Sequence, residues 1–361
     1  MGTWKWEVGI WKVRYLLLIL ITIGMETNIA MSACNKDEIL SKEGNGTESY
    51  SHITTDDSVR HMVNHPAFKG FGQYLLPRDN GTSDYDRPLN QVGSLMPYHE
   101  HVDPNIVLGA INHMIGEINN GKTIFYDFYA EHQKRKDPAK ASTGLFFFRG
   151  QPGAPFVIAC PGGGFSYVGS LHEGFPLAMV LSQRGYNSFV LRYRTGGGLR
   201  ATEDLAAAIS YVFKNAQRLG VSVADYSLWG GSAGARMVGN IALHGTAGFG
   251  GDDLPKPRIV VIAYTGHTIF SEHFPPTFIM VSEDDGIVNV PTVDRCVENM
   301  RNAGIEVEYR KFKKAGHGFG LGTGTDAEGW IEHAIQFWEK HQSKCKLIPH
   351  SPPLTSDPLT F

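Results

Sequence analysis

Ser232, Asp285 and His317 are side chains of the types that carry out acyl transfer, and they follow one another in that order along the chain. Ser232 is the centre of GGSAG, a G-x-S-x-G motif between a short apolar run and a helical pattern. Glycines on both sides of the serine allow a sharp strand-to-helix turn in which a Cβ would clash. Such a turn displays the hydroxyl, so Ser232 is predicted to be a nucleophile.

Asp285 and His317 each follow a predicted strand. Asp285 lies in SEDDGIV after the run TFIMVS, and His317 lies in KKAGHGFGLG after the run EVEYRKF. A histidine can take the serine proton as general base, while a carboxylate orients the imidazole and stabilises its charge. Glu283 and Asp284 compete with Asp285 for the role of the acid.

The stretch CPGGGF, Cys160 to Phe165, ends an early predicted strand. Acyl transfer needs backbone amides that point at the developing oxyanion, and glycines expose their amides best. A phosphate-binding loop is the alternative, but the stretch matches neither G-x-G-x-x-G nor G-x-x-x-x-G-K-[ST]. The glycines are therefore predicted to form part of an oxyanion hole.

These residues must be positioned by the elements around them. From residue 142 onward, short apolar runs such as PFVIAC, NSFVLRYR, YSLWG and RIVVIAY alternate with helical patterns such as ATEDLAAAISYVFKNAQRLG. This alternation predicts an α/β protein with a mostly parallel sheet covered by helices on both faces. Because catalytic groups gather at the carboxyl ends of parallel strands, the three candidate residues are expected to meet there.

The motifs together resemble the serine esterases of the α/β-hydrolase superfamily. The resemblance extends from Leu145 to Trp338 and rests on CPGGGFSYVGSLHEGFPLA, GYNSFVLRYR, GGSAG, PPTFIMVSEDDGIV and AGHGFGLG. The group includes the acetyl-xylan and other carbohydrate acetyl esterases and, more distantly, the hormone-sensitive-lipase-like esterases. It implies the α/β-hydrolase fold.

The same resemblance implies a role for each residue of the triad. Ser232 would be the nucleophile and His317 the general base. Asp285 is preferred as the acid because in this group the acid usually stands three residues before a valine, here Val288. The activity implied is hydrolysis of short-chain esters through an acyl-enzyme.

The resemblance also implies that Gly163, Gly164 and Ala233 supply the oxyanion amides. Pro161 stands where many lipase-like relatives have the first histidine of an H-G-G-G loop, which favours the acetyl-esterase side. The expected substrate is an ester of an acetylated saccharide, with no metal and no organic cofactor. Two alternatives stay open: a serine peptidase of the prolyl-oligopeptidase type, and a catalytically silent lipoprotein that binds glycans.

The first 33 residues have the pattern of a signal peptide. Lys5, Lys12 and Arg14 precede the apolar run YLLLILITIGM, which is short for a membrane span. Cys34 follows Ser-Ala as in a bacterial lipobox, although Met31 replaces the preferred leucine. We expect a lipoprotein outside the cytoplasm, anchored to the membrane through a lipidated Cys34; ordinary secretion and an uncleaved anchor are the alternatives.

The remaining chain is divided by composition. Residues 34–55 are polar and are expected to form a flexible tether, and residues 56–140 an N-terminal extension that folds over the site as a lid. The catalytic domain is expected at 141–342 and a proline-rich disordered tail at 343–361. Within the extension, YHEHVD is expected to be a polar loop, with metal binding as the less favoured reading.

Charge and cysteine content exclude some classes of function. The net charge of the 361 residues is −3, which gives no reason to expect nucleic acid as a partner. The 4 cysteines show no CxxC spacing, and if Cys34 carries lipid an odd number is left. A zinc site and a disulfide framework are therefore not expected.

Overall fold

The computed structural model describes residues 49–78 and 84–343. The described residues belong to one compact unit that begins at Ser49. The predicted signal peptide, the lipidation of Cys34 and the tail after residue 343 lie outside the described residues, and so they stay predictions. Among the residues described, no helix is long and apolar enough to cross a membrane.

The centre of the unit is an eight-stranded sheet with the strand order β1-β2-β4-β3-β5-β6-β7-β8. β2 pairs antiparallel with β1 and with β4, and every other neighbouring pair from β4 to β8 is parallel. The bounds of the strands are β1 Phe125–Tyr126, β2 Gly144–Phe148, β3 Pro155–Cys160, β4 Asn187–Arg192, β5 Ser222–Gly231, β6 Ile259–Ala263, β7 Thr277–Ser282 and β8 Val307–Phe312.

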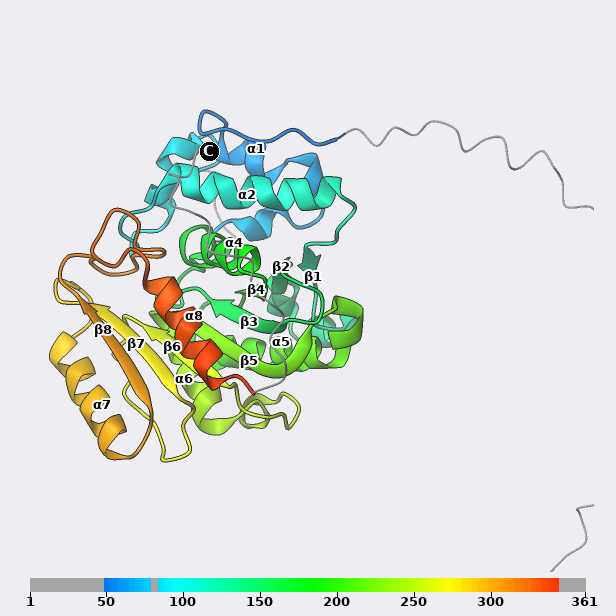
Figure 1. Cartoon of the computed structure of the whole chain (residues 1–361). Helices are drawn as coiled ribbons and strands as arrows, with labels where there is room; N and C mark the ends of the chain where they lie inside the picture. Colours follow the sequence, from blue (N-terminus) through cyan, green and yellow to red (C-terminus); the bar gives the residue numbers. More distant parts are fainter. Residues whose placement is uncertain (1–48, 79–83, 344–361) are drawn as a thin grey trace, which may run out of the picture. The chain divides into compact units, whose positions relative to one another are not determined.

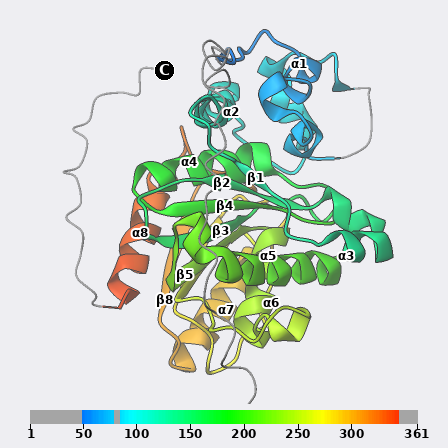
Figure 2. The same ribbon diagram turned by 90° about the vertical axis from the view of Figure 1, so that its right-hand side faces the viewer.

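Helices cover both faces of this sheet (Figures 1 and 2). α2, α4 and α8 contribute to the apolar core on one face, and α5, α6 and α7 to the core on the other. The bounds of the helices are α1 Val59–Val63, α2 Pro104–Asn119, α3 Glu131–Lys136, α4 Phe175–Gln183, α5 Gly198–Leu219, α6 Ala233–His244, α7 Val290–Asn302 and α8 Trp330–His341.

The strand sequences explain why both faces must be covered. In β3, Val157 and Ala159 pack in the core beneath α4, whereas Phe156 and Ile158 pack in the core beneath α5. Successive side chains of a strand point to opposite faces, so a continuous apolar run buries apolar area on both sides. The predicted three-layer α/β architecture is therefore confirmed.

The described residues of the extension, 56–78 and 84–140, pack on the sheet and contribute to it. Phe125 of β1 pairs with Phe146 of β2, so the segment supplies the edge strand. The predicted tether is wrong in its last residues. Ile53 is buried, and its backbone amide donates to Asn112 Oδ1 at 3.0 Å. A side-chain amide on α2 thus holds a stretch that composition alone marks as flexible.

Candidate active site

Ser232 forms the sharp turn between β5 and α6. Its backbone has φ 49° and ψ −114°, a strained conformation for a residue with a Cβ. The flanking glycines are required by space, because a Cβ on Gly234 would lie 1.8 Å from the carbonyl oxygen of Cys160. A Cβ on Gly230 would lie 2.6 Å from the amide nitrogen of Ala235. The turn predicted from the glycine pattern is therefore present, with Ser232 at its apex.

The structure brings Ser232, His317 and Asp285 together. His317 Nε2 lies 3.0 Å from Ser232 Oγ, and its Nδ1 lies 2.8 Å from Asp285 Oδ2. Asp285 is held in turn by the backbone amides of Ile287 and Val288, each donating to Oδ1 at 2.8 Å. Since Asp285 accepts a hydrogen bond from the protonated Nδ1, Nε2 carries no proton and can accept the proton of the serine.

The competing acids face elsewhere. Asp284 accepts hydrogen bonds from Ser282 Oγ at 2.5 Å and from the Gly316 amide at 2.9 Å. It thereby ties the loop after β7 to the loop that carries His317. Glu283 is exposed. Of the three neighbouring carboxylates, only Asp285 reaches the imidazole.

Three backbone amides were predicted to form the oxyanion hole. Within the described residues, the amides of Gly163, Gly164 and Ala233 donate no hydrogen bond. Ala233 is the first residue of α6, where the helix itself offers no acceptor. The Gly162 amide is different because it donates to the Glu173 carboxylate. The amides predicted for the oxyanion hole are thus the ones left available for a ligand.

Comparison with known sequences finds distant relatives. No family model matches the chain. An acetylxylan esterase of Xylanibacter ruminicola is 24% identical over 244 residues, which cover 59% of this chain and 49% of that protein. Endo-1,4-beta-xylanase B of Butyrivibrio fibrisolvens is 26% identical over 221 residues, covering 48% of this chain and 34% of that protein. The chain therefore spans about half of the first relative and about a third of the second.

Comparison with solved structures bears on the fold of the chain. The acetyl ester-xyloside bifunctional hydrolase from Caldicellulosiruptor lactoaceticus aligns with 60% of this chain and 95% of its own, at 20% identity and a TM-score of 0.51. The strand order and the turn at Ser232 agree with that likeness. The chain has the α/β-hydrolase fold. The predicted fold is confirmed, and so is the resemblance to acetylxylan esterases.

A buried carboxylate behind Ser232 is a feature that the sequence analysis did not predict. Glu173 accepts hydrogen bonds from the Gly162 amide and from Tyr264 Oη, the latter at 2.8 Å. Its Oε1 also lies 3.1 Å from His99 Nε2. A Cβ on Gly231 would come within 2.8 Å of Glu173 Oε2, so the carboxylate lies directly behind the nucleophile turn.

Glu173 is ionised because its partners outweigh its burial. Burial works to raise the pKa of the Glu173 carboxyl, but the His99 imidazole and hydrogen bonds from His99, Gly162 and Tyr264 lower it to about 2. Burial, followed by the charge of Glu173, raises the pKa of Tyr264, which keeps its proton as a donor. A charge fixed in this position holds the loop of Gly162 against Tyr264, which follows β6.

The preceding residue, His172, holds the loop that carries His317. Its Nε2 lies 3.0 Å from the carbonyl oxygen of Gly318, to which it donates. Burial lowers the pKa of His172 to about 4, and His99 nearby acts in the same direction. His172 and Glu173 both belong to a single π-helical turn, Ser170–Gly174, just before α4. Such turns are frequent at functional sites.

The N-terminal extension takes part in the site through the loop YHEHVD. His99 reaches Glu173, and Glu100 Oε1 accepts a hydrogen bond from the backbone amide of His317 at 3.3 Å. Asp103 caps α2 by accepting from the Asn105 amide at 2.8 Å. The loop's acidic and imidazole groups thus have separate partners, and in the described part of the chain no group of three or more His, Cys, Asp or Glu could hold a metal ion.

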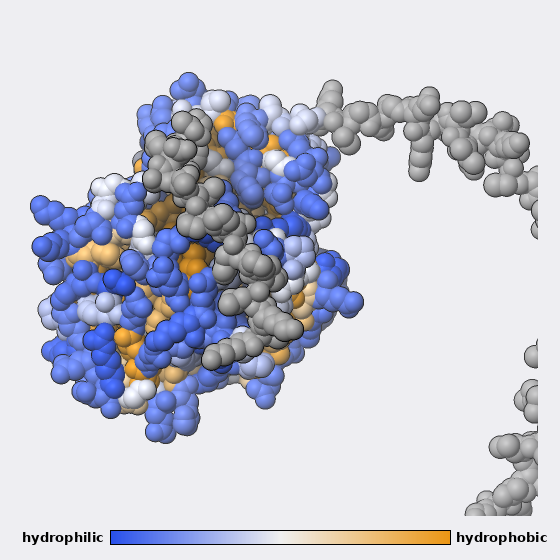
Figure 3. Space-filling view, viewed as in Figure 1, coloured by the Kyte–Doolittle hydropathy of each residue, from blue (hydrophilic) through white to orange (hydrophobic). Residues whose placement is uncertain are grey.

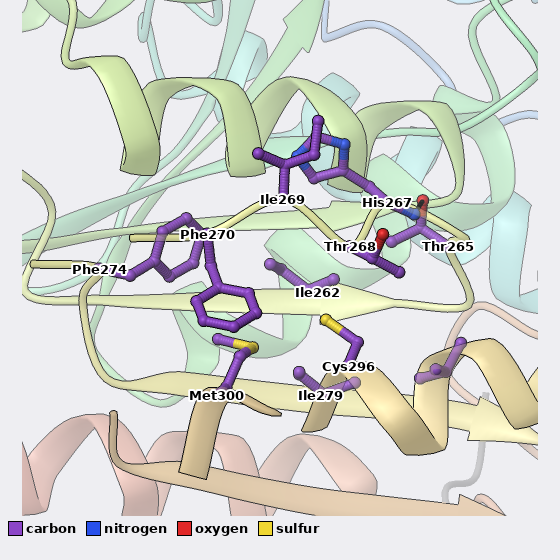
Figure 4. A pocket seen from close by; sticks show the side chains of 11 residues that line it. Ile262, Thr265, His267, Thr268, Ile269, Phe270, Phe274, Ile279, Cys296 and Met300 are labelled. Carbon is purple, nitrogen blue, oxygen red and sulfur yellow. Dashed lines mark hydrogen bonds between the residues drawn. The ribbon is translucent and has the colours of Figure 1, made fainter. Parts of the chain in front are cut away.

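An apolar cavity lies beside the site, between the loop after β6 and helix α7 (Figure 4). Phe270, Phe274, Cys296 and Met300 are among its lining residues. None of the triad residues lines it. The ester that reacts with Ser232 is therefore not expected to bind there.

Proposed function

We propose that this α/β-hydrolase is a serine esterase that removes short acyl groups, acetyl above all, from carbohydrate. The observation that carries the proposal is the continuous contact from Asp285 through His317 to Ser232, at 2.8 Å and 3.0 Å. The proposal is also supported by the backbone amides of Gly163, Gly164 and Ala233, which donate no hydrogen bond within the described residues and so are available to an oxyanion. The acetylxylan esterase among the relatives supports acetyl and xylan as the two parts of the substrate.

The reaction follows from this geometry in two steps. His317 takes the proton of Ser232 Oγ while that oxygen bonds to the ester carbonyl carbon, and the amides of the oxyanion hole stabilise the negative oxygen. His317 then gives the proton to the departing alcohol oxygen, which leaves an acyl-serine. Water attacks the acyl-serine with His317 again as base, and the acid is released with Ser232 restored.

The proposal is tested by comparing p-nitrophenyl acetate with p-nitrophenyl octanoate, together with the release of acetate from acetylated xylan. We expect the acetate to be cleaved preferentially, and Ser232→Ala to abolish both activities without a change in thermal midpoint. Covalent labelling of Ser232 by a fluorophosphonate reports on the serine independently of the substrate. A labelled protein that cleaves neither ester would favour the peptidase alternative, and an unlabelled protein would favour the silent glycan-binding protein.

A further inference from the structure

Few large apolar side chains are exposed among the residues that the structure describes. On the face in Figure 3, hydrophobic side chains form small patches between hydrophilic ones. Tyr98 is one of the exposed side chains, because 42% of it is accessible to solvent. Its place beside Gly164 and Gly318 makes the ring a candidate contact for a substrate.

Tyr98 lies between the two loops that would handle the ester. Its ring contacts the oxyanion loop, where a Cβ on Gly164 would lie 3.1 Å from Cε2 of the tyrosine. Its carbonyl oxygen lies against the other loop, 2.8 Å from the position of a Cβ on Gly318, next to His317. The departing alcohol oxygen must sit close to His317, and the Tyr98 backbone lies against Gly318, the residue that follows His317.

The ring is held in a fixed orientation. It stacks on the buried ring of Tyr167, with centroids 5.5 Å apart and planes 23° apart. The backbone amide of Tyr98 donates to Tyr167 Oη at 2.9 Å, and His99, the next residue, is buried beside the same hydroxyl. A ring fixed in this way loses little conformational entropy when it binds a ligand.

We propose that Tyr98 is an aromatic platform for the sugar ring that carries the ester. A pyranose presents C–H groups on its faces, and stacking them on an aromatic ring removes apolar area from water. The phenol hydroxyl at the ring edge adds a donor and acceptor for sugar hydroxyls. The inference rests on the proposed function and deepens it, because it assigns Tyr98 as the residue that recognises the sugar ring of the substrate.

The test compares two acetates that differ in the sugar. A monoacetylated methyl β-xyloside carries the pyranose, whereas methyl acetate does not, and neither has an aromatic group that could itself stack on Tyr98. Tyr98→Ala is expected to lower kcat/KM for the xyloside about tenfold, mainly through KM, and to leave methyl acetate within about twofold. Tyr98→Phe keeps the ring and should keep most of the activity on the xyloside.

Tyr50→Ala is the matched control, since Tyr50 is 37% exposed and its backbone amide is bonded to Asn119 on α2. It is expected to change neither activity. Equal losses on both esters in Tyr98→Ala would overturn the platform, because the ring would then act on the oxyanion loop itself. If Tyr98→Ala cleaves the xyloside as well as the wild-type protein does, the platform is overturned as well. The proposed esterase activity would then still stand. A wild-type protein inactive on both esters would remove the proposed function and the platform together.

Discussion

His99 Nε2 lies 3.1 Å from Glu173 Oε1, and both side chains are almost fully buried. This contact joins the N-terminal extension to the carboxylate that holds the glycine loop Cys160–Phe165. The same carboxylate accepts hydrogen bonds from the Gly162 amide in that loop and from Tyr264, which follows β6. Three segments far apart in sequence therefore meet at one charge behind Ser232.

Removing the negative charge of Glu173 should impair catalysis more than substrate binding. Glu173→Gln keeps the size of the side chain but removes the negative charge that orders the Gly162 amide. We expect kcat to fall about 10- to 100-fold with little change in KM, because misplaced oxyanion donors weaken stabilisation of the transition state and not of the substrate. Steady-state kinetics on p-nitrophenyl acetate, with a thermal midpoint measured in parallel, provides the check.

Tyr129→Phe is the control for this variant. Tyr129 Oη donates to Asp204 at 2.7 Å in a buried contact that also ties the extension to the core. Its loss should cost about 1 kcal/mol of stability and change kcat much less than Glu173→Gln, because it removes no contact to Gly162. Similar falls of kcat in both variants would show that Glu173 acts only through general stability.

Asp285 and Asp284 are adjacent carboxylates with different expected effects. Asp285→Asn keeps the shape but favours the wrong imidazole tautomer of His317, so kcat should fall about 10³- to 10⁴-fold. Asp284→Asn disturbs only the contacts to Ser282 and Gly316 and should cost much less activity. Kinetics of the two variants side by side decide between the candidates, and a larger loss in Asp284→Asn would reverse the assignment.

The sequence was sufficient for features that local rules determine. The strands are continuous apolar runs and the turn at Ser232 needs glycines on both sides, so the alternation of elements and the motif were readable. The triad could be ordered because Asp285 and His317 each follow a strand. The choice of Asp285 over Asp284 needed the resemblance, since composition cannot show which of two neighbouring carboxylates turns toward the imidazole.

The contacts behind the serine could not be predicted in this way. Glu173 and His99 are buried charged and imidazole groups in stretches that look like an ordinary helix start and a polar loop. Their pairing depends on a tertiary contact between residues 74 positions apart (173 − 99). The one available signal was that Glu173 stands 11 residues after Gly162, whose amide donates to it. Without the fold, this spacing does not indicate a contact.

The close packing around the turn at Ser232 leads to a prediction about stability. Gly234→Ala places a methyl group 1.8 Å from the carbonyl oxygen of Cys160, a backbone atom that cannot move aside. We expect a loss of about 3 kcal/mol or more, or failure to fold. Gly116→Ala in α2 meets nothing within 4 Å and should instead stabilise by about 0.5–1 kcal/mol. Urea unfolding of both variants measures the difference, and similar stabilities would contradict the close packing at the turn.

His172 predicts how stability depends on pH. Its folded-state pKa is about 4, lowered from 6.5 chiefly by burial and then by His99. Between pH 6.5 and pH 4 the unfolded chain therefore binds the proton and the folded protein does not, so stability falls as the pH falls through this window. The pKa of Glu173, lowered from 4.5 to about 2, acts in the same direction but only below about pH 4.5.

Measuring the free energy of unfolding at pH 7 and at pH 5 separates the effects of His172 and Glu173. Of these two groups, only His172 has a large effect between the two pH values. The wild-type protein should lose about 2 kcal/mol through this histidine between the two values. His172→Gln keeps a donor for the Gly318 carbonyl but cannot titrate, so its free energy of unfolding should fall by about 2 kcal/mol less over the same range. Burial also lowers the pKa of His65, His113 and His267, but these residues are common to both proteins and cancel in the comparison. Equal pH dependence in the two proteins would mean that His172 is protonated at the same pH whether the chain is folded or unfolded.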